Sequence, residues 1–291
     1  MADNERPRRR ADRDDRGRAG RPGRDRGERG DRGDRRRANR GGRGQAEARG
    51  PRTGPQRPGF REERMGLRAN EPALPDDVRA DELDPSVRQD LRSLAKDNAD
   101  AVARHMVMAA SLLAEDPGKA LRHARAAKDR AGRVGVVRET LGVAAYHAGE
   151  WREALAELRA ARRISGGPGM LAVMADCERG LGRPEKAIEL GRSAEAEQLD
   201  EDDRTELAIV LAGARRDLGD VAGALLELET RNPDPRAEDL ASARLFYAYG
   251  DALAAAGRLE EARTWLRRVA KLDPDDALQA RARLDELGKG R

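Results

Sequence analysis

The feature that most constrains the fold of this 291-residue chain is a short frame that occurs five times. The frame consists of an alanine and the position five residues before it, and that position is glycine in four of the five copies. The alanines are Ala120, Ala154, Ala187, Ala224 and Ala262; the preceding position holds Glu115, Gly149, Gly182, Gly219 and Gly257. The intervals between the alanines are 34, 33, 37 and 38 residues. Self-similarity at this period is typical of solenoids built from repeated helical units.

Each copy of the frame has the pattern of two packed helices. From Asp84 onward apolar residues recur at three- and four-residue spacing, and Ala and Leu dominate. Antiparallel helices that cross closely need small side chains at the contact and a glycine where the chain reverses. Twelve residues before the frame alanines stand Met108, Gly142, Ala175, Ala212 and Gly250, and four of these five are small. We therefore predict five helix–turn–helix units.

The units resemble the tetratricopeptide repeat. The resemblance is most complete in LFYAYGDALAAAGRLEEARTWLRRVAKLDP, where Phe246, Gly250, Gly257, Ala262, Leu266 and Pro274 take the family's aromatic, small, turn, alanine, bulky and proline positions. The earlier copies lack the terminal proline in frame and have Arg104, Arg138, Leu171 and Ala208 at the aromatic position. The resemblance covers about residues 101–274. It implies an all-α, right-handed solenoid of about five units.

Composition divides the chain into three regions. Residues 1–59 hold 20 Arg, no Lys and 10 Asp or Glu, which is a net charge of +10 with few apolar residues, so we predict a disordered arm. Residues 60–83 are punctuated by proline and are predicted to be a linker. Residues 84–291 carry the solenoid, with a lead-in helix at 84–97 and a capping helix at 275–288. The whole chain is +4, so residues 60–291 carry −6.

Residue types that perform catalysis have no telling arrangement in this sequence. The three histidines are scattered, Cys177 has no His or Asp at a useful spacing, and HExxH, CxxC and GxSxG do not occur. We therefore expect no enzymatic activity, no metal, no cofactor and no small-molecule substrate. The longest apolar run, 106–114, is about half of what a bilayer crossing needs, and the start has no apolar signal region. We expect a soluble cytoplasmic protein with no membrane partner.

The resemblance implies that the first helices of the units line a concave face that binds other proteins. Transferred to this sequence, the candidate binding residues are His105, Glu139, Val143, Tyr146, Asp176, Arg179, Arg216, Tyr247 and Asp251. The Lys and Asn positions of the family's carboxylate clamp hold other residues here, which disfavours that subclass. Arg179 and Arg216 fall in one column of adjacent units and could hold an acidic peptide. The alternative for each residue is an ordinary solvated helix face.

The leading hypothesis is a non-catalytic adaptor that binds a peptide or helix of another protein in the groove. The basic arm would add salt-sensitive electrostatic contacts. The alternative is a nucleic-acid- or ribosome-associated protein whose arm contacts RNA, since Arg pairs with phosphate and stacks on bases. Arg-Gly pairs favour RNA binding, whereas the interleaved acids and the lack of aromatic residues weaken it. The partner, the pathway, the oligomeric state and any role of the arm stay open.

Overall fold

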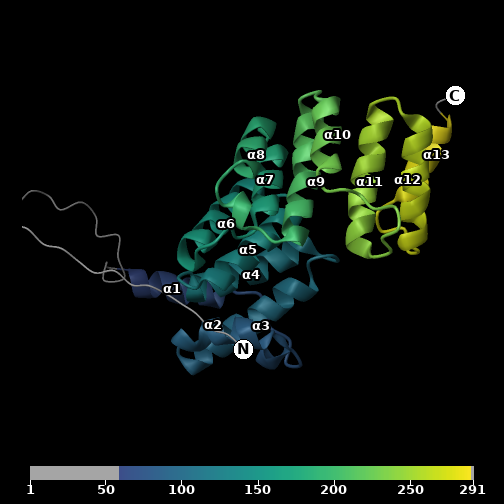
Figure 1. Cartoon of the computed structure of the whole chain (residues 1–291). Helices are drawn as coiled ribbons and strands as arrows, with labels where there is room; N and C mark the ends of the chain where they lie inside the picture. Colours follow the sequence, from purple (N-terminus) through teal and green to yellow (C-terminus); the bar gives the residue numbers. More distant parts are fainter. Residues whose placement is uncertain (1–58, 290–291) are drawn as a thin grey trace, which may run out of the picture. The chain divides into compact units, whose positions relative to one another are not determined.

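A computed structural model describes residues 59–289, and within them every regular element is a helix (Figure 1). This confirms the all-α prediction; the predicted arm lies outside the described residues, except for Gly59. Five consecutive helix pairs follow one another along the chain. They are α3 (Lys96–Ser111) with α4 (Pro117–Ala131), α5 (Gly135–His147) with α6 (Trp151–Ser165), α7 (Leu171–Gly180) with α8 (Pro184–Gly191), α9 (Glu201–Asp217) with α10 (Val221–Glu229), and α11 (Leu240–Ala255) with α12 (Leu259–Leu272).

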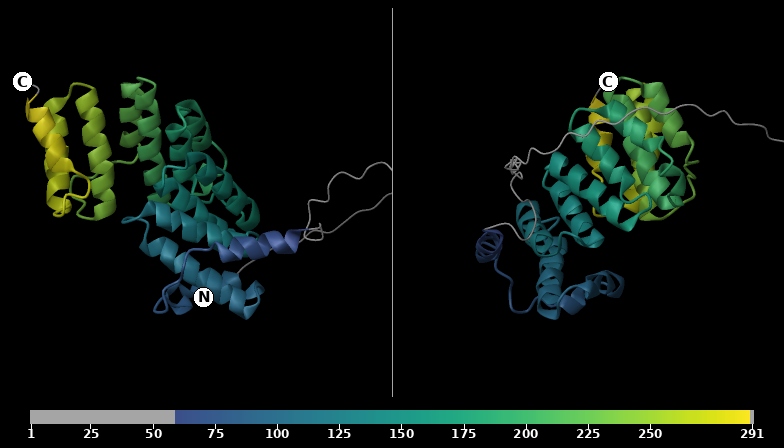
Figure 2. Two further views of the ribbon diagram at one scale, coloured as in Figure 1. Left: turned by 180° about the vertical axis from the view of Figure 1, so that it is seen from behind. Right: turned by 90° about the vertical axis from the view of Figure 1, so that its left-hand side faces the viewer.

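The pairs stack so that equivalent helices become neighbours. Each leading helix (α3, α5, α7, α9 or α11) packs on its own trailing helix (α4, α6, α8, α10 or α12). Each leading helix also contacts the leading helix of the next pair, and each trailing helix contacts the leading helix that follows it. Two views of the ribbon show the antiparallel pairs side by side (Figure 2). The division into five pairs matches the prediction.

The four frame glycines end the leading helices of the second to fifth pairs. Their φ angles, between 71° and 77°, lie in the left-handed region that glycine adopts without a steric cost. At Gly149 the amide donates to the carbonyl of Tyr146, and the next amide, that of Glu150, donates to the carbonyl of Ala145. The same pair of hydrogen bonds recurs at the other three glycines. Together they form a Schellman motif, which satisfies the last carbonyls and reverses the chain.

The frame alanines lie where the two helices of a pair approach most closely. All five are completely buried. In the second pair an ideal Cβ on Gly142 would lie 2.6 Å from the Cγ of Leu158, which is the residue four positions after the frame alanine. In the fifth pair the equivalent distance, from Gly250 to the Cγ of Leu266, is 3.1 Å. Small residues at these positions therefore let a bulky leucine pack directly on the opposite backbone.

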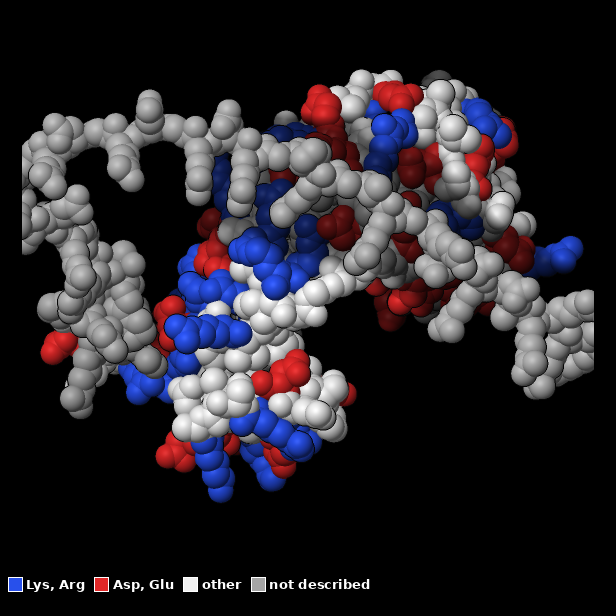
Figure 3. All heavy atoms as spheres, turned by 60° about the vertical axis from the view of Figure 1, so that its left-hand side comes forward, with Lys and Arg blue, Asp and Glu red and all other residues white. Residues whose placement is uncertain are grey.

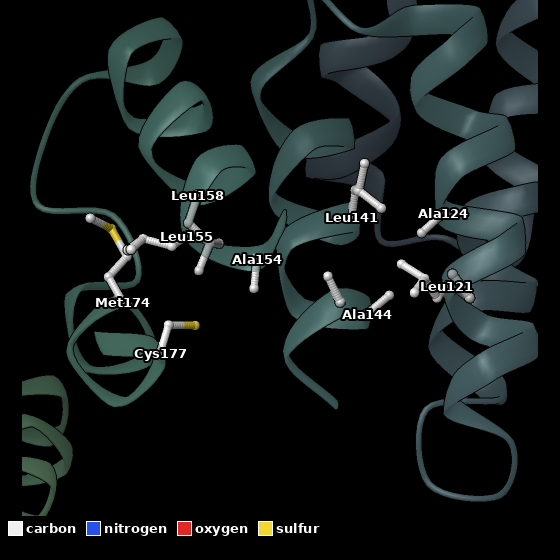
Figure 4. Packing of buried hydrophobic residues seen from close by; sticks show 11 residues of the cluster. Leu121, Ala124, Leu141, Ala144, Ala154, Leu155, Leu158, Met174 and Cys177 are labelled. Atoms are coloured by element: carbon white, nitrogen blue, oxygen red, sulfur yellow. The ribbon is translucent and has the colours of Figure 1, made fainter. Parts of the chain in front are cut away.

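The apolar core runs continuously from one pair to the next. One cluster joins Leu121 of α4, Leu141 of α5, Leu158 of α6 and Met174 of α7, all at most 5% exposed. Figure 4 shows these side chains between the ribbons, with Leu121 and Leu141 on the right, Leu158 and Met174 on the left and the frame alanine Ala154 between them. Further clusters extend the core to the helices that follow. Each pair thus buries its apolar surface against its neighbours, as repeat architectures require.

The first pair turns differently because it lacks the glycine. The leading helix α3 is capped at Leu112, and residues 112–115 form a longer turn before Asp116 caps α4. Glu115 is not in the left-handed region. The carboxylate of Asp116 accepts from the amide of Lys119, and Pro117, which has no N–H to leave unpaired, begins α4.

Both helices that were predicted to flank the solenoid differ from expectation. The lead-in helix is broken into α2 (Pro85–Asp90) and a 3-10 turn, Leu91–Ser93, because Leu91 and the extended Leu94 both turn into the core. The capping helix is α13 (Ala280–Lys289) and starts five residues late. The carboxylate of the buried Asp273 accepts from the amide of Leu278 at 2.7 Å, which holds the preceding residues in a turn.

The stretch predicted as a linker contains a helix of its own. Helix α1 (Phe60–Ala69) precedes Pro72 and Pro75, and a 3-10 turn covers Ala80–Glu82. Polar contacts help attach the stretch to the first pair: Glu71 pairs with Arg130 of α4, and Arg104 of α3 donates to main-chain carbonyls.

Candidate protein-binding face

The leading helices α5, α7, α9 and α11 together form one surface, which we call the leading-helix face. Eight of the nine predicted binding residues lie on these four helices, and all eight are neither fully buried nor fully exposed. Val143 and Tyr146 come from α5, and Tyr247 comes from α11. Partial exposure of this kind lets a side chain be held by its own fold and still contact a partner.

His105 is the exception, and its assignment to the binding face is corrected. Its side chain is 1% exposed. Its Nδ1 lies 3.0 Å from the Nδ1 of His123 on α4, so one ring donates a hydrogen bond to the other. The opposite edge, Nε2, faces the carboxylate of Glu71 at 3.7 Å. Burial lowers the pKa of His105 to about 4, and burial lowers that of His123 too.

Glu139 lies on α5, toward the beginning of the helix. Burial raises the pKa of its carboxyl group above the ordinary value. A half-buried carboxylate is costly to keep charged unless a cation comes near.

Tyr146, Asp176 and Arg179 are brought together in a chain of hydrogen bonds across α5, α7 and α9. The hydroxyl of Tyr146 donates to Oδ2 of Asp176 at 2.6 Å, and Nη1 of Arg179 donates to Oδ1 of Asp176 at 2.7 Å. The Nε of Arg179 donates to Oδ2 of Asp217 on α9 at 2.9 Å. Burial and the bond to Asp176 raise the pKa of Tyr146, so its hydroxyl stays a donor at neutral pH.

Arg216 and Asp251 form a second chain, which continues to α13. The Nη1 of Arg216 donates to Oδ2 of Asp251 at 2.5 Å, and Nε of Arg283 donates to Oδ1 of the same carboxylate at 2.8 Å. Tyr247 lies one turn before Asp251, and burial together with that carboxylate raises its pKa. Sequence reasoning missed Asp217 and Arg283, which belong to the next pair or the capping helix and carry no local signal.

These pairings change the interpretation of the two arginines. Both guanidinium groups were expected to be available for an acidic peptide, but each already binds a carboxylate of another helix. The carboxylates offset the charge of both guanidinium groups and occupy some of their five N–H donors, which weakens their attraction for a peptide carboxylate. The leading-helix face therefore presents interlocked charges and not a free basic column.

Cys177, the one cysteine of the chain, is not placed for nucleophilic catalysis. Cys177 is completely buried in the core, and burial raises the pKa of its thiol to about 12, so the nucleophilic thiolate is not formed at neutral pH. Within residues 59–289 no group of three His, Cys, Asp or Glu side chains is placed to hold a metal ion. No helix in the same range is long and apolar enough to span a membrane.

Comparison with known protein families gives a match at the fifth helix pair. Residues 243–276 match the family model of the tetratricopeptide repeat. The matched range covers most of α11 and all of α12, the pair in which the sequence resemblance is most complete. No curated protein matches the chain.

The tetratricopeptide repeat is in general a non-catalytic unit of protein–protein interaction, so the match indicates an interaction role. The four preceding pairs have the same buried alanine at the helix contact, and three of them have the same glycine turn.

Proposed function

We propose that this chain is a non-catalytic adaptor that binds a peptide or helix of another protein on its leading-helix face. The observation that carries the proposal is the stacking of α5, α7, α9 and α11 into one surface. Its side chains are held half-exposed by hydrogen bonds between pairs, such as Tyr146 to Asp176 and Arg216 to Asp251. A pre-organised surface loses little side-chain entropy on binding. The arm, residues 1–59, would add electrostatic contacts.

The test is affinity capture with the full chain and two matched double variants. Tyr247→Ala with Arg216→Ala removes partly exposed groups of the leading-helix face. Arg152→Ala with Arg163→Ala removes exposed groups of α6, a trailing helix. We expect a stoichiometric protein partner whose recovery falls about tenfold with the first variant only, a difference of about 1.4 kcal/mol. Equal recovery with both variants, at unchanged helicity, would place binding elsewhere.

A second candidate function is RNA binding by the arm, favoured by its 20 arginines and net charge of +10. Lys and Arg that neutralise phosphates release counterions, so affinity for RNA should fall steeply as salt rises. The full chain should bind a single-stranded RNA in low salt with such a slope, and removal of residues 1–59 should abolish the slope. If the full chain fails to bind in low salt, this function is excluded.

A further inference from the structure

A notch of about 680 Å³ opens beside the turn between α7 and α8, at one edge of the leading-helix face. It is lined by the indole of Trp151, the first residue of α6, and by Asp176 and Arg179 of α7. Asp217 at the end of α9 and Glu185 at the beginning of α8 complete it. Three helix pairs therefore contribute to one recess, which we call the turn notch.

Two glycines shape the walls of the turn notch. An ideal Cβ on Gly180 would lie 2.8 Å from Cδ2 and Cε2 of Trp151, so the indole rests where a side chain would otherwise stand. An ideal Cβ on Gly213 of α9 would lie 2.6 Å from the Cζ of Arg179. The indole of Trp151 and the guanidinium of Arg179 thus each pack against the backbone of a glycine. Hydrogen bonds from Arg179 to Asp176 and Asp217 fix the guanidinium. The walls are pre-formed by the fold.

The turn notch has an excess of negative charge. It contains three carboxylates and one guanidinium, and that guanidinium is shared between Asp176 and Asp217. The side chain of Asp217 is 43% exposed, and that of Asp176 is 25% exposed. Glu185 is exposed and makes no ion pair with any residue of the described range 59–289. All three carboxylates can therefore accept further hydrogen bonds from a bound group.

The helix pairs around the turn notch add to its negative electrostatic potential. Residues 171–239, which form the third and fourth pairs, hold 18 Asp or Glu against 9 Arg or Lys, a net charge of −9. Residues 96–170, the first and second pairs, carry +4 by the same count. One side of the described surface shows basic and acidic side chains interspersed (Figure 3). The excess acid is thus a property of the middle pairs and not of the whole molecule, and it attracts basic groups to them.

The aromatic wall selects for the same kind of ligand. The rings of Trp151 and Tyr146 meet edge to face, with centroids 5.4 Å apart. A tryptophan face attracts ammonium and guanidinium groups, and the attraction adds to that of nearby carboxylates. An acidic peptide would meet three like charges in this recess, and an apolar side chain would desolvate carboxylates without replacing their hydrogen bonds.

We propose that the turn notch binds an Arg or Lys side chain of a basic segment in the partner protein. This inference rests on the proposed adaptor function and names the chemistry of its partner. The cation would lie between the carboxylates of Glu185 and Asp217 and the indole of Trp151. A basic partner also explains why the column that contains Arg179 is neutralised by acids: a free guanidinium there would repel the ligand.

The test uses the full chain and a short fluorescein-labelled peptide in which Arg alternates with Ser. Glu185→Gln removes one unpaired charge without changing shape, and should weaken binding about two- to fivefold, as expected for one exposed ion pair. Glu185→Gln with Asp217→Asn should weaken it about tenfold. The matched control, Glu238→Gln with Asp202→Asn, removes two exposed acids of the same acidic stretch outside the notch and should change affinity less than twofold.

Tryptophan fluorescence gives an independent readout, since the chain has two tryptophans. Quenching by the Arg peptide should disappear in Trp151→Phe and persist in Trp265→Phe. Equal losses in the notch and control variants would show diffuse attraction only, and equal binding of a peptide with Glu in place of Arg would show an acidic ligand; either result overturns the proposal.

The two proposals can fail separately. A captured partner that depends on Tyr247 and Arg216 but is indifferent to Glu185→Gln would leave the adaptor function standing and exclude the notch as its site.

Discussion

The first and fifth helix pairs share the frame alanine but differ in the side chains around it, which are polar in the first pair and aromatic in the fifth. Ala120 and Ala262 are equally buried at the helix contact. Sixteen residues before each alanine stands Arg104 in the first pair and Phe246 in the fifth. Phe246 is completely buried, whereas Arg104 donates to the carbonyls of Val78 and Pro75 at 2.8 and 2.7 Å. At this position the fifth pair is stabilised by burial of an aromatic ring, and the first by hydrogen bonds to the segment that precedes it.

The side chains around these positions extend the contrast. In the fifth pair the ring of Trp265 lies 4.9 Å from that of Phe246 and 5.4 Å from that of Tyr249, between centroids. In the first pair the position equivalent to Trp265 is His123, which bonds to His105. The difference teaches that the buried alanine and the helix crossing define the unit. The neighbouring positions adapt to the segment that covers them, which is α13 with the turn before it at one end and residues 70–95 at the other.

The largest expected effect is at the aromatic position of the fifth pair. Phe246→Ala removes a fully buried ring that contacts Trp265, and should lower the free energy of unfolding by about 4 kcal/mol. Arg104→Ala at the equivalent position removes hydrogen bonds from a partly exposed group and should cost only about 1.5 kcal/mol. Urea denaturation followed by circular dichroism measures both. Equal losses would mean that the two pairs are stabilised in the same way.

The second-largest effect is expected at the ion pair that joins the first helix pair to the segment before it. Arg130 and Glu71 are 17% and 11% exposed, and Nη2 of Arg130 lies 2.5 Å from Oε2 of Glu71. Arg130→Met leaves the nearly buried carboxylate of Glu71 without its cation and facing only His105, which should cost about 3 kcal/mol.

Two variants control this experiment. Arg125→Met breaks the more exposed pair with Glu153 and should cost about 0.5 kcal/mol. Glu71→Gln combined with Arg130→Met should recover part of the loss, because no charge is then stranded. A loss from Arg130→Met no larger than that from Arg125→Met would show that the segment does not depend on this pair.

The bonded histidines His105 and His123 should make the stability of the first helix pair depend on pH, and the fifth helix pair contains no histidine. Because the folded pKa of His105 is about 4 and an unfolded histidine titrates near 6.5, the unfolded chain binds more protons between these values. Stability from the neutral pair is therefore complete above pH 6.5 and is lost as the pH falls toward 4. The approach of Glu71 opposes the shift, whereas the charges of His123 and Arg130 support it.

Between pH 7 and pH 5 this linkage amounts to about 2 kcal/mol. Urea denaturation at the two pH values should show the loss in the natural sequence. His105→Leu combined with His123→Leu should flatten the dependence. If the double variant keeps the same slope, groups other than this pair control acid stability in that range.

The elements that the sequence predicted well are those whose cause is local. Gly257 and Ala262 are five residues apart, so one short stretch contains both the turn and the close contact. His105 was misplaced because Glu71, which covers it, is far away in the chain and has no periodic signal. Arg179 shows both cases: Asp176 lies three residues away on its own helix, whereas Asp217 is 38 residues away. Repeats predict the framework, and the contacts between units decide what each exposed position can do.

The smallest expected effect is at the turn, where the first and fifth pairs should respond with opposite preferences. Gly257 has φ of 77°, so Gly257→Ala places a Cβ in the left-handed region; the strain, partly offset by a less flexible unfolded chain, should cost about 1 kcal/mol. Glu115 holds the same frame position without that conformation, so Glu115→Ala should change stability by less than about 0.5 kcal/mol. Glu115→Gly should destabilise by about 0.5 kcal/mol, because it only adds freedom to the unfolded chain. Thermal denaturation of the three variants measures these differences, and a stabilising Glu115→Gly would mean that the first pair, like the other four, prefers the glycine turn.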